Sequence, residues 1–153
     1  MPQAMRKTNI PNYRKSKRPK LADRADRHHL YQRAVQNVEG EIDMIDKTFE
    51  KLTRRKAVSL REDFCGTANT SCEWVRRREE NFSFGIDLDQ GVLDWGMINN
   101  VQQLSEATQS RIKLLKENVL TAKTPSVDVV LAMNFSYQIF KTREALTEYF
   151  HVV

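Results

Sequence analysis

Apolar side chains recur along this sequence first with a helical period and then in short runs typical of strands. The helical spacing is clearest over residues 42–52, where apolar residues return at steps of three and four: Ile42, Ile45, Phe49 and Leu52. A shorter apolar side covers residues 30–35. We therefore predict two opening helices, one over about 22–38 and one ending near residue 56, with Gly40 interrupting the pattern between them.

Beyond residue 56, short apolar runs alternate with helical segments. The predicted strands cover 57–62, 82–87, 111–115 and 127–133. The predicted helices cover 68–77, 90–98, 101–108 and 142–153, the last with Leu146, Tyr149 and Phe150 on one side. This alternation predicts an α/β fold: a Rossmann-like parallel sheet with flanking helices, incomplete at about four strands and preceded by N-terminal helices.

The composition is that of a single globular domain. The chain has 153 residues, of which 40% are hydrophobic and 29% charged. We expect no membrane helix, because no stretch approaches the roughly 18 apolar residues required, and no secretory signal. Cys65 and Cys72 have neither disulfide-scaffold nor zinc-site spacing, and the histidines show no metal-ligand pattern, so we expect a cytoplasmic protein without a metal.

Positive charge is concentrated in the first residues. Residues 1–27 hold nine Lys/Arg against two acids, whereas the whole chain has a net charge of +5, so the remainder is slightly negative. We predict a flexible basic arm over 1–21 and a domain over 22–153. The arm gives an alternative function, a nucleic-acid-binding module that contacts phosphates. Tyr13 is its only aromatic residue, and a solvated tail explains the same charges.

The ends of the predicted strands carry the candidate chemistry, because ligands of parallel sheets bind beyond the carboxyl ends of the strands. Gly66 follows the first strand and opens a helix, where free N–H groups favour an acceptor. Asp87 ends the second strand 21 residues later, where a carboxylate is placed to accept both ribose hydroxyls. The competing interpretation is a helix cap, a role that suits Asp89 better.

Two further strand ends add weaker signals. Glu117 and Asn118 follow the third strand, where an acid or amide meets an adenine amino group and Val119 covers a ring face. After the fourth strand, polar residues emerge at Asn134, Ser136 and Tyr137. A polar loop with Phe135 and Phe140 in the core is the competing interpretation.

Four segments, taken in order, resemble the motifs of class I S-adenosylmethionine-dependent methyltransferases. They are SLREDFCGTANTSCEWV, FGIDLDQGVLDWG, LLKENVL and DVVLAMNFSYQIFKTREAL. The resemblance covers about residues 28–153 and is closest to a bacterial-type group with an EDFCGTA first motif. It implies S-adenosylmethionine as cofactor and methyl transfer to an unknown acceptor by direct displacement, so no catalytic residue is assigned.

Matching by position carries the roles of cofactor-binding residues over from that family. The resemblance implies that Glu62 helps to hold the methionine end and that Asp87 binds the ribose. The other matched positions are Cys65, Gly66 and Thr67 in the first turn, Leu88, Asn118 and Val119 near the adenine, and Asn134 near the transferable methyl. This sequence departs from the family at Phe64 and Ala68, where glycines often stand, and at Asn118, where an acid is usual.

The family generally has seven strands, and this sequence supplies about four. We therefore expect a fragment, in which residues 22–153 are the N-terminal cofactor-binding part of a methyltransferase domain and either transfer a methyl group or only bind the cofactor. Its fourth strand is expected to be an edge, available for self-association with another chain. A nicotinamide-dependent enzyme is a further alternative, because Asp87 suits a dinucleotide equally well. The absence of GxGxxG argues against that alternative.

Overall fold

The computed structural model describes residues 20–153, and residues 1–19 of the predicted arm lie outside the described residues. The helices are α1 (Leu21–Arg24), α2 (Arg27–Val35), α3 (Val38–Thr53), α4 (Asn69–Arg77), α5 (Gln90–Asn99), α6 (Glu106–Gln109) and α7 (Arg143–Val152). The strands are β1 (Ser59–Asp63), β2 (Phe82–Asp87), β3 (Ile112–Lys116) and β4 (Val129–Leu131). Residues 20–153 also contain two short 3-10 helices, η1 (Val101–Gln103) and η2 (Ser136–Ile139).

The strands form one parallel sheet in the order β3-β2-β1-β4. The fold predicted from the alternating pattern is confirmed. The chain adds β2 and β3 on one side of β1 and then returns to place β4 on the other side. Such a reversal opens a crevice beyond the carboxyl ends of the central strands, where ligands of open α/β sheets bind. The segments that follow β1 and β4 are the walls of that crevice.

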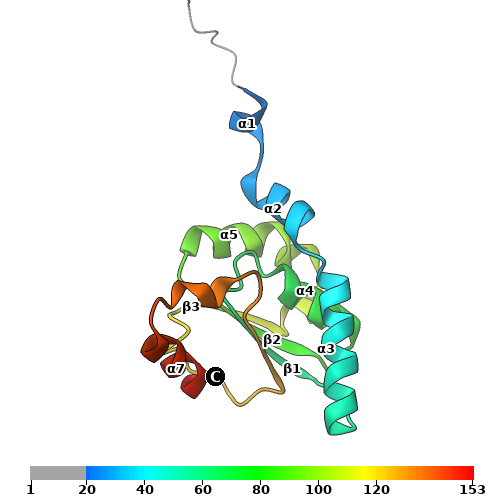
Figure 1. Ribbon diagram of the computed structural model, residues 1–153. Coiled ribbons are helices and arrows are strands. Elements are labelled where there is room, and N and C mark those ends of the chain that lie inside the picture. The colour runs from blue at the N-terminus through cyan, green and yellow to red at the C-terminus, as the bar shows by residue number, and fades with distance from the viewer. Residues whose placement is uncertain (1–19) are drawn as a thin grey trace, which may run out of the picture.

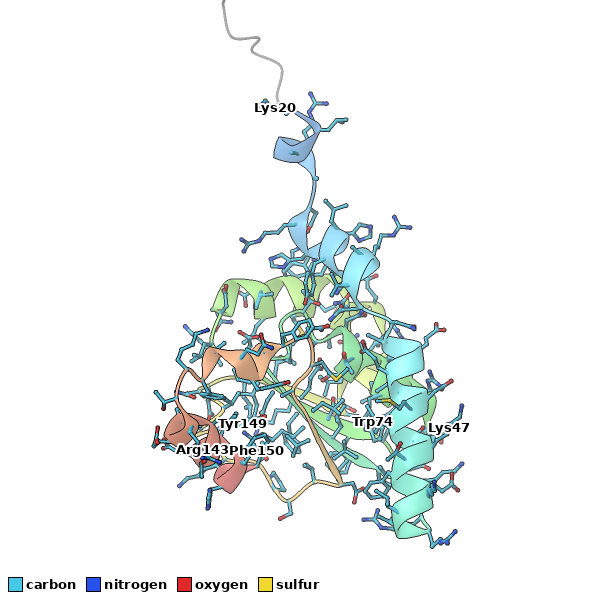
Figure 2. The ribbon with its side chains drawn as sticks, in the orientation of Figure 1. Lys20, Lys47, Trp74, Arg143, Tyr149 and Phe150 are labelled. Atoms are coloured by element: carbon cyan, nitrogen blue, oxygen red, sulfur yellow. The ribbon has the colours of Figure 1, made fainter. Side chains whose placement is uncertain are left out.

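One face of the sheet packs against α3 and α4. Its core contains Ile42, Ile45, Ala57, Leu60, Trp74, Val75 and Leu131. Figure 1 shows α3 along this side, and Figure 2 places Trp74 between α3 and the strands. The indole N–H of Trp74 donates to the carbonyls of Val58 and Phe82, each at 3.2 Å, so the ring joins β1 and β2 while remaining fully buried.

The opposite face packs against α7 through a buried polar network. Arg61 donates to Asp63 Oδ1 at 2.7 Å, and the hydroxyl of Tyr149 donates to Asp63 Oδ2 at 2.9 Å. Arg61 also donates to the carbonyl of Val119 at 2.7 Å. All three side chains of the network are less than 5% exposed, so the ion pair is satisfied within the protein. The network joins α7, where Figure 2 labels Tyr149, to Asp63 at the end of β1.

The first predicted helix differs from the structure because two side chains act as caps. Asp26 accepts hydrogen bonds from the N–H groups of His28 and His29, which starts α2 at residue 27 and separates it from α1. Gly40 does not interrupt the pattern. It lies in the first turn of α3, where its N–H donates to the side chain of Asn37. Local capping therefore sets boundaries that apolar periodicity does not reveal.

Other boundaries also move. The segment predicted as one helix over 101–108 divides into η1 and α6 because Ser105 caps α6. The fourth strand is three residues long, and η2 follows it where a loop was expected. Phe150 was placed on the apolar side of the last helix but is 63% exposed, and Phe135 lies outside the core at 75% exposed. Within residues 20–153, no helix is both long and apolar enough to span a bilayer.

Candidate functional site

The turn between β1 and α4 has left-handed backbone at three alternate residues. The φ angles are +58° at Phe64, +54° at Gly66 and +56° at Ala68. Residues that carry a Cβ rarely adopt this backbone conformation, because the Cβ then approaches the following carbonyl. Glycine adopts it without strain. The alternation explains why glycines often stand at positions 64 and 68 in the resembled family.

Gly66 leaves open space above the turn. A Cβ built on Gly66 meets no other atom within 4 Å. Phe64 packs its ring against Phe140 and Tyr149, with centroids 6.1 and 6.2 Å away. The approach to the backbone at Gly66 is therefore not blocked by Phe64.

Asp87 connects the second strand to this turn. Its Oδ2 accepts the N–H of Gly66 at 2.8 Å, and its Oδ1 accepts the N–H of Asp89 at 2.9 Å. A carboxylate offers about four acceptor positions, so two remain for a ligand. Asp89 caps α5 through the N–H groups of Gly91 and Val92, as the sequence indicated. The structure thus brings Gly66 and Asp87 together and separates the roles of the two acids.

Glu62 lies on the same sheet face as Asp87, because it is paired in register with Gly85, two residues before Asp87. Its Oε2 accepts both the N–H and the hydroxyl of Ser71, at 2.9 and 2.6 Å. Ala68 stands at the N-cap of α4 and has no side chain for capping. Glu62 therefore supplies the cap from β1 and fixes the far end of the turn.

Burial is the main cause of the raised pKa values of Glu62 and Cys65. Burial raises the pKa of Glu62 to about 7, although the hydrogen bonds from Ser71 oppose this rise. Burial also raises the pKa of the Cys65 thiol, and the charges of Glu62 and Asp87 reinforce the effect. Cys65 is therefore a neutral thiol at physiological pH, packed where a Cβ on Gly85 would lie 3.0 Å from its sulfur.

Thr67 is held from two further elements. The side chain of Gln32 in α2 donates to Thr67 Oγ1 at 2.6 Å. The side chain of Asn100 donates to the carbonyl of Thr67 at 2.8 Å. A Cβ on Gly96 would lie 2.4 Å from that same carbonyl oxygen, so α5 approaches the turn closely only because residue 96 is glycine.

The remaining predicted residues near the adenine position divide into exposed and buried ones. Leu88 is 62% exposed beside Asp87 and is free to contact a ligand. Asn118 is exposed too, but its Oδ1 accepts the N–H of Leu120 at 3.0 Å and so also shapes its own loop. Val119 lies in the core with Ile86 and Tyr149 at 4% exposed, and the structure does not bring it to the crevice.

Asn134 lies on the other wall of the crevice, after β4. It has a φ of +57°, and Phe135 follows with +62°. Two consecutive non-glycine residues in left-handed conformation are uncommon and concentrate at functional segments. The N–H and hydroxyl of Ser136 both donate to the carbonyl of Met133, at 3.2 and 2.7 Å, which stabilises the bend.

Sequence reasoning did not identify Gln32, Gly96 or Asn100 as parts of the site. Their contacts to Thr67 come from α2 and α5, so no local spacing in the first motif indicates them. A usable signal existed for Gly96 only, because a glycine near the middle of a predicted helix often marks a close backbone approach.

No protein-family model matches this chain, and no curated protein matches it. Solved structures, however, do align with this chain. CalS10 from Micromonospora echinaspora, an S-adenosylmethionine-bound amino pentose methyltransferase, aligns with a TM-score of 0.64 at 12% identity, covering 92% of this chain and 52% of that chain. The sugar N-methyltransferase KedS8 from Streptoalloteichus aligns with a TM-score of 0.64 at 12% identity, covering 98% of this chain and 54% of that chain.

The methyltransferase domain of bacterial CtHen1 aligns with a TM-score of 0.58 at 14% identity, covering 81% of this chain and 59% of that domain structure. These alignments establish the fold: the chain has the Rossmann-like fold of S-adenosylmethionine-dependent methyltransferases. The chain spans between about half and three fifths of the length of these three solved structures.

Proposed function

We propose that this protein binds S-adenosylmethionine at the turn after β1 and transfers its methyl group to an acceptor. The observation that carries the proposal is the left-handed turn at Gly66 joined to Asp87 by a 2.8 Å hydrogen bond beside the crevice. The open space above Gly66 and the two unused acceptor positions of Asp87 fit an adenosine whose ribose hydroxyls donate to that carboxylate. Solved methyltransferases of the same fold support the choice of cofactor.

The proposed roles extend those that the resemblance implies, and the geometry of the turn supports them. When bound, the cofactor supplies a sulfonium-activated methyl group. Asp87 holds the ribose, Gly66 allows close approach of the backbone, and Leu88 contacts the adenine together with the amide of Asn118. Glu62 acts through the cap of α4 rather than by exposing its carboxylate. Alignment of acceptor and methyl at near-attack distance supplies roughly 7–11 kcal/mol, so a displacement needs no covalent catalyst.

The test compares two neighbouring acids by calorimetric titration with S-adenosylhomocysteine. Asp87→Ala removes the acceptor of both the Gly66 N–H and the ribose, so we expect affinity to fall by about 1.5–3 kcal/mol. Asp89→Ala is the matched control. It removes only the cap of α5 and lowers the free energy of unfolding by about 1 kcal/mol, with affinity unchanged. Equal affinity for wild type and Asp87→Ala would remove Asp87 from the site.

A nucleic-acid-binding module remains the second candidate, because one observation favours it. The described basic residues Arg24 and Arg27 stand on either side of the N-cap residue Asp26 of α2, and α2 is bonded to Thr67 of the proposed site. Titration with a short single-stranded RNA and with NAD, beside S-adenosylhomocysteine, separates the candidates. Binding of RNA alone, with a steep dependence on salt, would reverse the ranking.

We also propose that β4 mediates self-association with a second copy. Among the described residues 20–153, β4 pairs with β1 alone, so its other edge presents unpaired backbone groups there. Beside it lies a cavity of about 350 Å³ lined largely by apolar residues of α3 and β4, among them Met44 and Leu52, which are 60% and 77% exposed. An apolar flank and an open strand edge together suit strand pairing.

A further inference from the structure

Helix α2 presents a polar stripe to the rest of the domain. His28, Gln32 and Gln36 are spaced four residues apart and therefore share one side of the helix. Gln32 donates to Thr67 at 2.6 Å, and Gln36 accepts from the side chain of Asn69 at 3.1 Å. Both partners belong to the segment that runs from the turn into α4.

The attachment of α2 depends on this stripe and on Trp95, which donates to the N-cap residue Asp26 at 2.7 Å, and not on a core. None of its residues is buried, and its apolar side chains Leu30, Tyr31 and Val35 are 55%, 44% and 50% exposed. A helix held by a few polar contacts opens at a lower free energy than one whose face is buried. Loss of one hydrogen bond therefore changes the position of α2 without unfolding the domain.

The point of attachment lies inside the proposed cofactor turn. Thr67 is 5% exposed and sits between Gly66 and Ala68, both in left-handed conformation. The N–H of Gly66, one residue away, is bonded to Asp87. Movement of Thr67 consequently alters the hydrogen bond on which the proposed ribose site is built.

We propose that α2 forms a further side of the cofactor site and that Gln32 is a positioning residue, which holds Thr67 so that the bond between Gly66 and Asp87 is maintained. This inference rests on the proposed function. Because coupling between two equilibria is reciprocal, cofactor binding in turn strengthens the attachment of α2. Gln32 is outside the residues that the sequence motifs assign to the site.

Three variants test Gln32 by calorimetric titration with S-adenosylhomocysteine. Gln32→Ala removes the bond to Thr67, and we expect about tenfold weaker affinity. Gln32→Glu replaces the donor by an acceptor, to which the Thr67 hydroxyl can donate by rotating, so the bond re-forms with its direction reversed and affinity returns to within about twofold of wild type. Arg33→Ala, at an exposed position on the same helix, controls for general effects on α2 and leaves affinity unchanged.

Hydrogen exchange without ligand gives an independent readout. In Gln32→Ala we expect faster exchange of the amides of residues 64–72 than in wild type, with an unchanged free energy of unfolding in denaturant. If wild type fails to bind S-adenosylhomocysteine, the proposed function fails, while the exchange comparison still decides whether Gln32 controls the turn. Unchanged exchange in Gln32→Ala, or an equal loss of affinity in Arg33→Ala, overturns the inference.

Discussion

At the scale of single residues, the turn between β1 and α4 combines one glycine with a relaxed backbone and two residues, Phe64 and Ala68, with a strained backbone. Left-handed backbone costs roughly 1–2 kcal/mol for an L-residue. Phe64 recovers part of that cost by packing its ring with Phe140 and Tyr149, and Ala68 by complete burial. The surrounding structure therefore holds the turn in a conformation that its local sequence only partly favours.

Gly66→Ala isolates the conformational requirement. No atom lies within 4 Å of the new methyl, so we expect the free energy of unfolding to fall by about 1–2 kcal/mol from backbone strain alone. Affinity for S-adenosylhomocysteine should fall further, since the methyl fills the space above the turn. Denaturant unfolding and calorimetry measure the two effects separately.

Ala68→Gly is the matched change in the same turn. Relief of strain there is offset by the loss of a buried methyl, worth about 0.8 kcal/mol, and by the added entropy of the unfolded chain, so stability stays close to that of wild type.

A Gly66→Ala protein with unchanged affinity for S-adenosylhomocysteine would mean that no ligand approaches the backbone at residue 66.

The same residues show how far sequence reasoning reaches. Gly66 and Asp87 were predicted to lie at neighbouring strand ends, and the structure joins them by a hydrogen bond. The burial of Val119 was not predicted, because its position depends on the carbonyl contact with Arg61, which comes from a distant strand. Residue type and spacing indicate which positions end a strand, but long-range packing decides which side chains remain accessible.

At the scale of elements, α4 begins at Asn69, and its N-cap position holds Ala68, whose side chain cannot cap a helix. Glu62 replaces the missing cap from β1, and its pKa is raised to about 7 by burial. A carboxyl group with a higher pKa in the folded state binds its proton more tightly there than in the unfolded chain. Its contribution to stability is therefore greatest below the unfolded value and declines as pH rises from about 4.5 to about 7.

We expect the free energy of unfolding of the wild type to fall between pH 5 and pH 8, with Glu62 contributing on the order of 3 kcal/mol at most. Glu62→Gln keeps an acceptor for the Ser71 N–H but does not titrate, so the decline should be smaller by that amount. Chemical denaturation of both proteins across this range measures the difference. Identical pH profiles would show that Glu62 does not titrate in this window.

Local N-cap residues matched the predicted helix starts at some boundaries but not at all of them. Asp89 and Thr142 cap α5 and α7 close to the predicted starts. The break between α1 and α2 was missed, although Asp26 is a good N-cap residue, because the apolar pattern continues across it. Periodicity reports the buried face of a helix, and α2 has no buried residue.

At the scale of the whole molecule, the two edges of the sheet differ. The β3 edge carries Lys113 and Lys116, both exposed, and lysines on an edge strand discourage pairing with other chains. The β4 edge is Val129–Leu131 and has no charge. Asp128 precedes it but turns inward, where its carboxylate accepts from Arg55 and from the N–H of Val58 at 2.7 Å.

A charge placed on the open edge tests self-association. Val130 lines cavities on both sides of β4. Val130→Lys therefore places a charge on the strand edge where a second copy would pair, and this charge discourages the pairing. We expect sedimentation velocity to show concentration-dependent association for wild type and a monomer for Val130→Lys. A wild-type protein that sediments as a monomer at all concentrations would disprove pairing through β4.

The contacts of the two tryptophans have a practical consequence. Trp74 is fully buried against the face of the sheet, whereas Trp95 donates to Asp26 at 2.7 Å and lies 5.3 Å from the ring of His28. Fluorescence of Trp95 is thus a native reporter of whether α2 is attached, and fluorescence of Trp74 reports whether the sheet is intact. A Trp74→Phe protein would allow the detachment of one helix to be followed optically, without a label, while the domain stays folded.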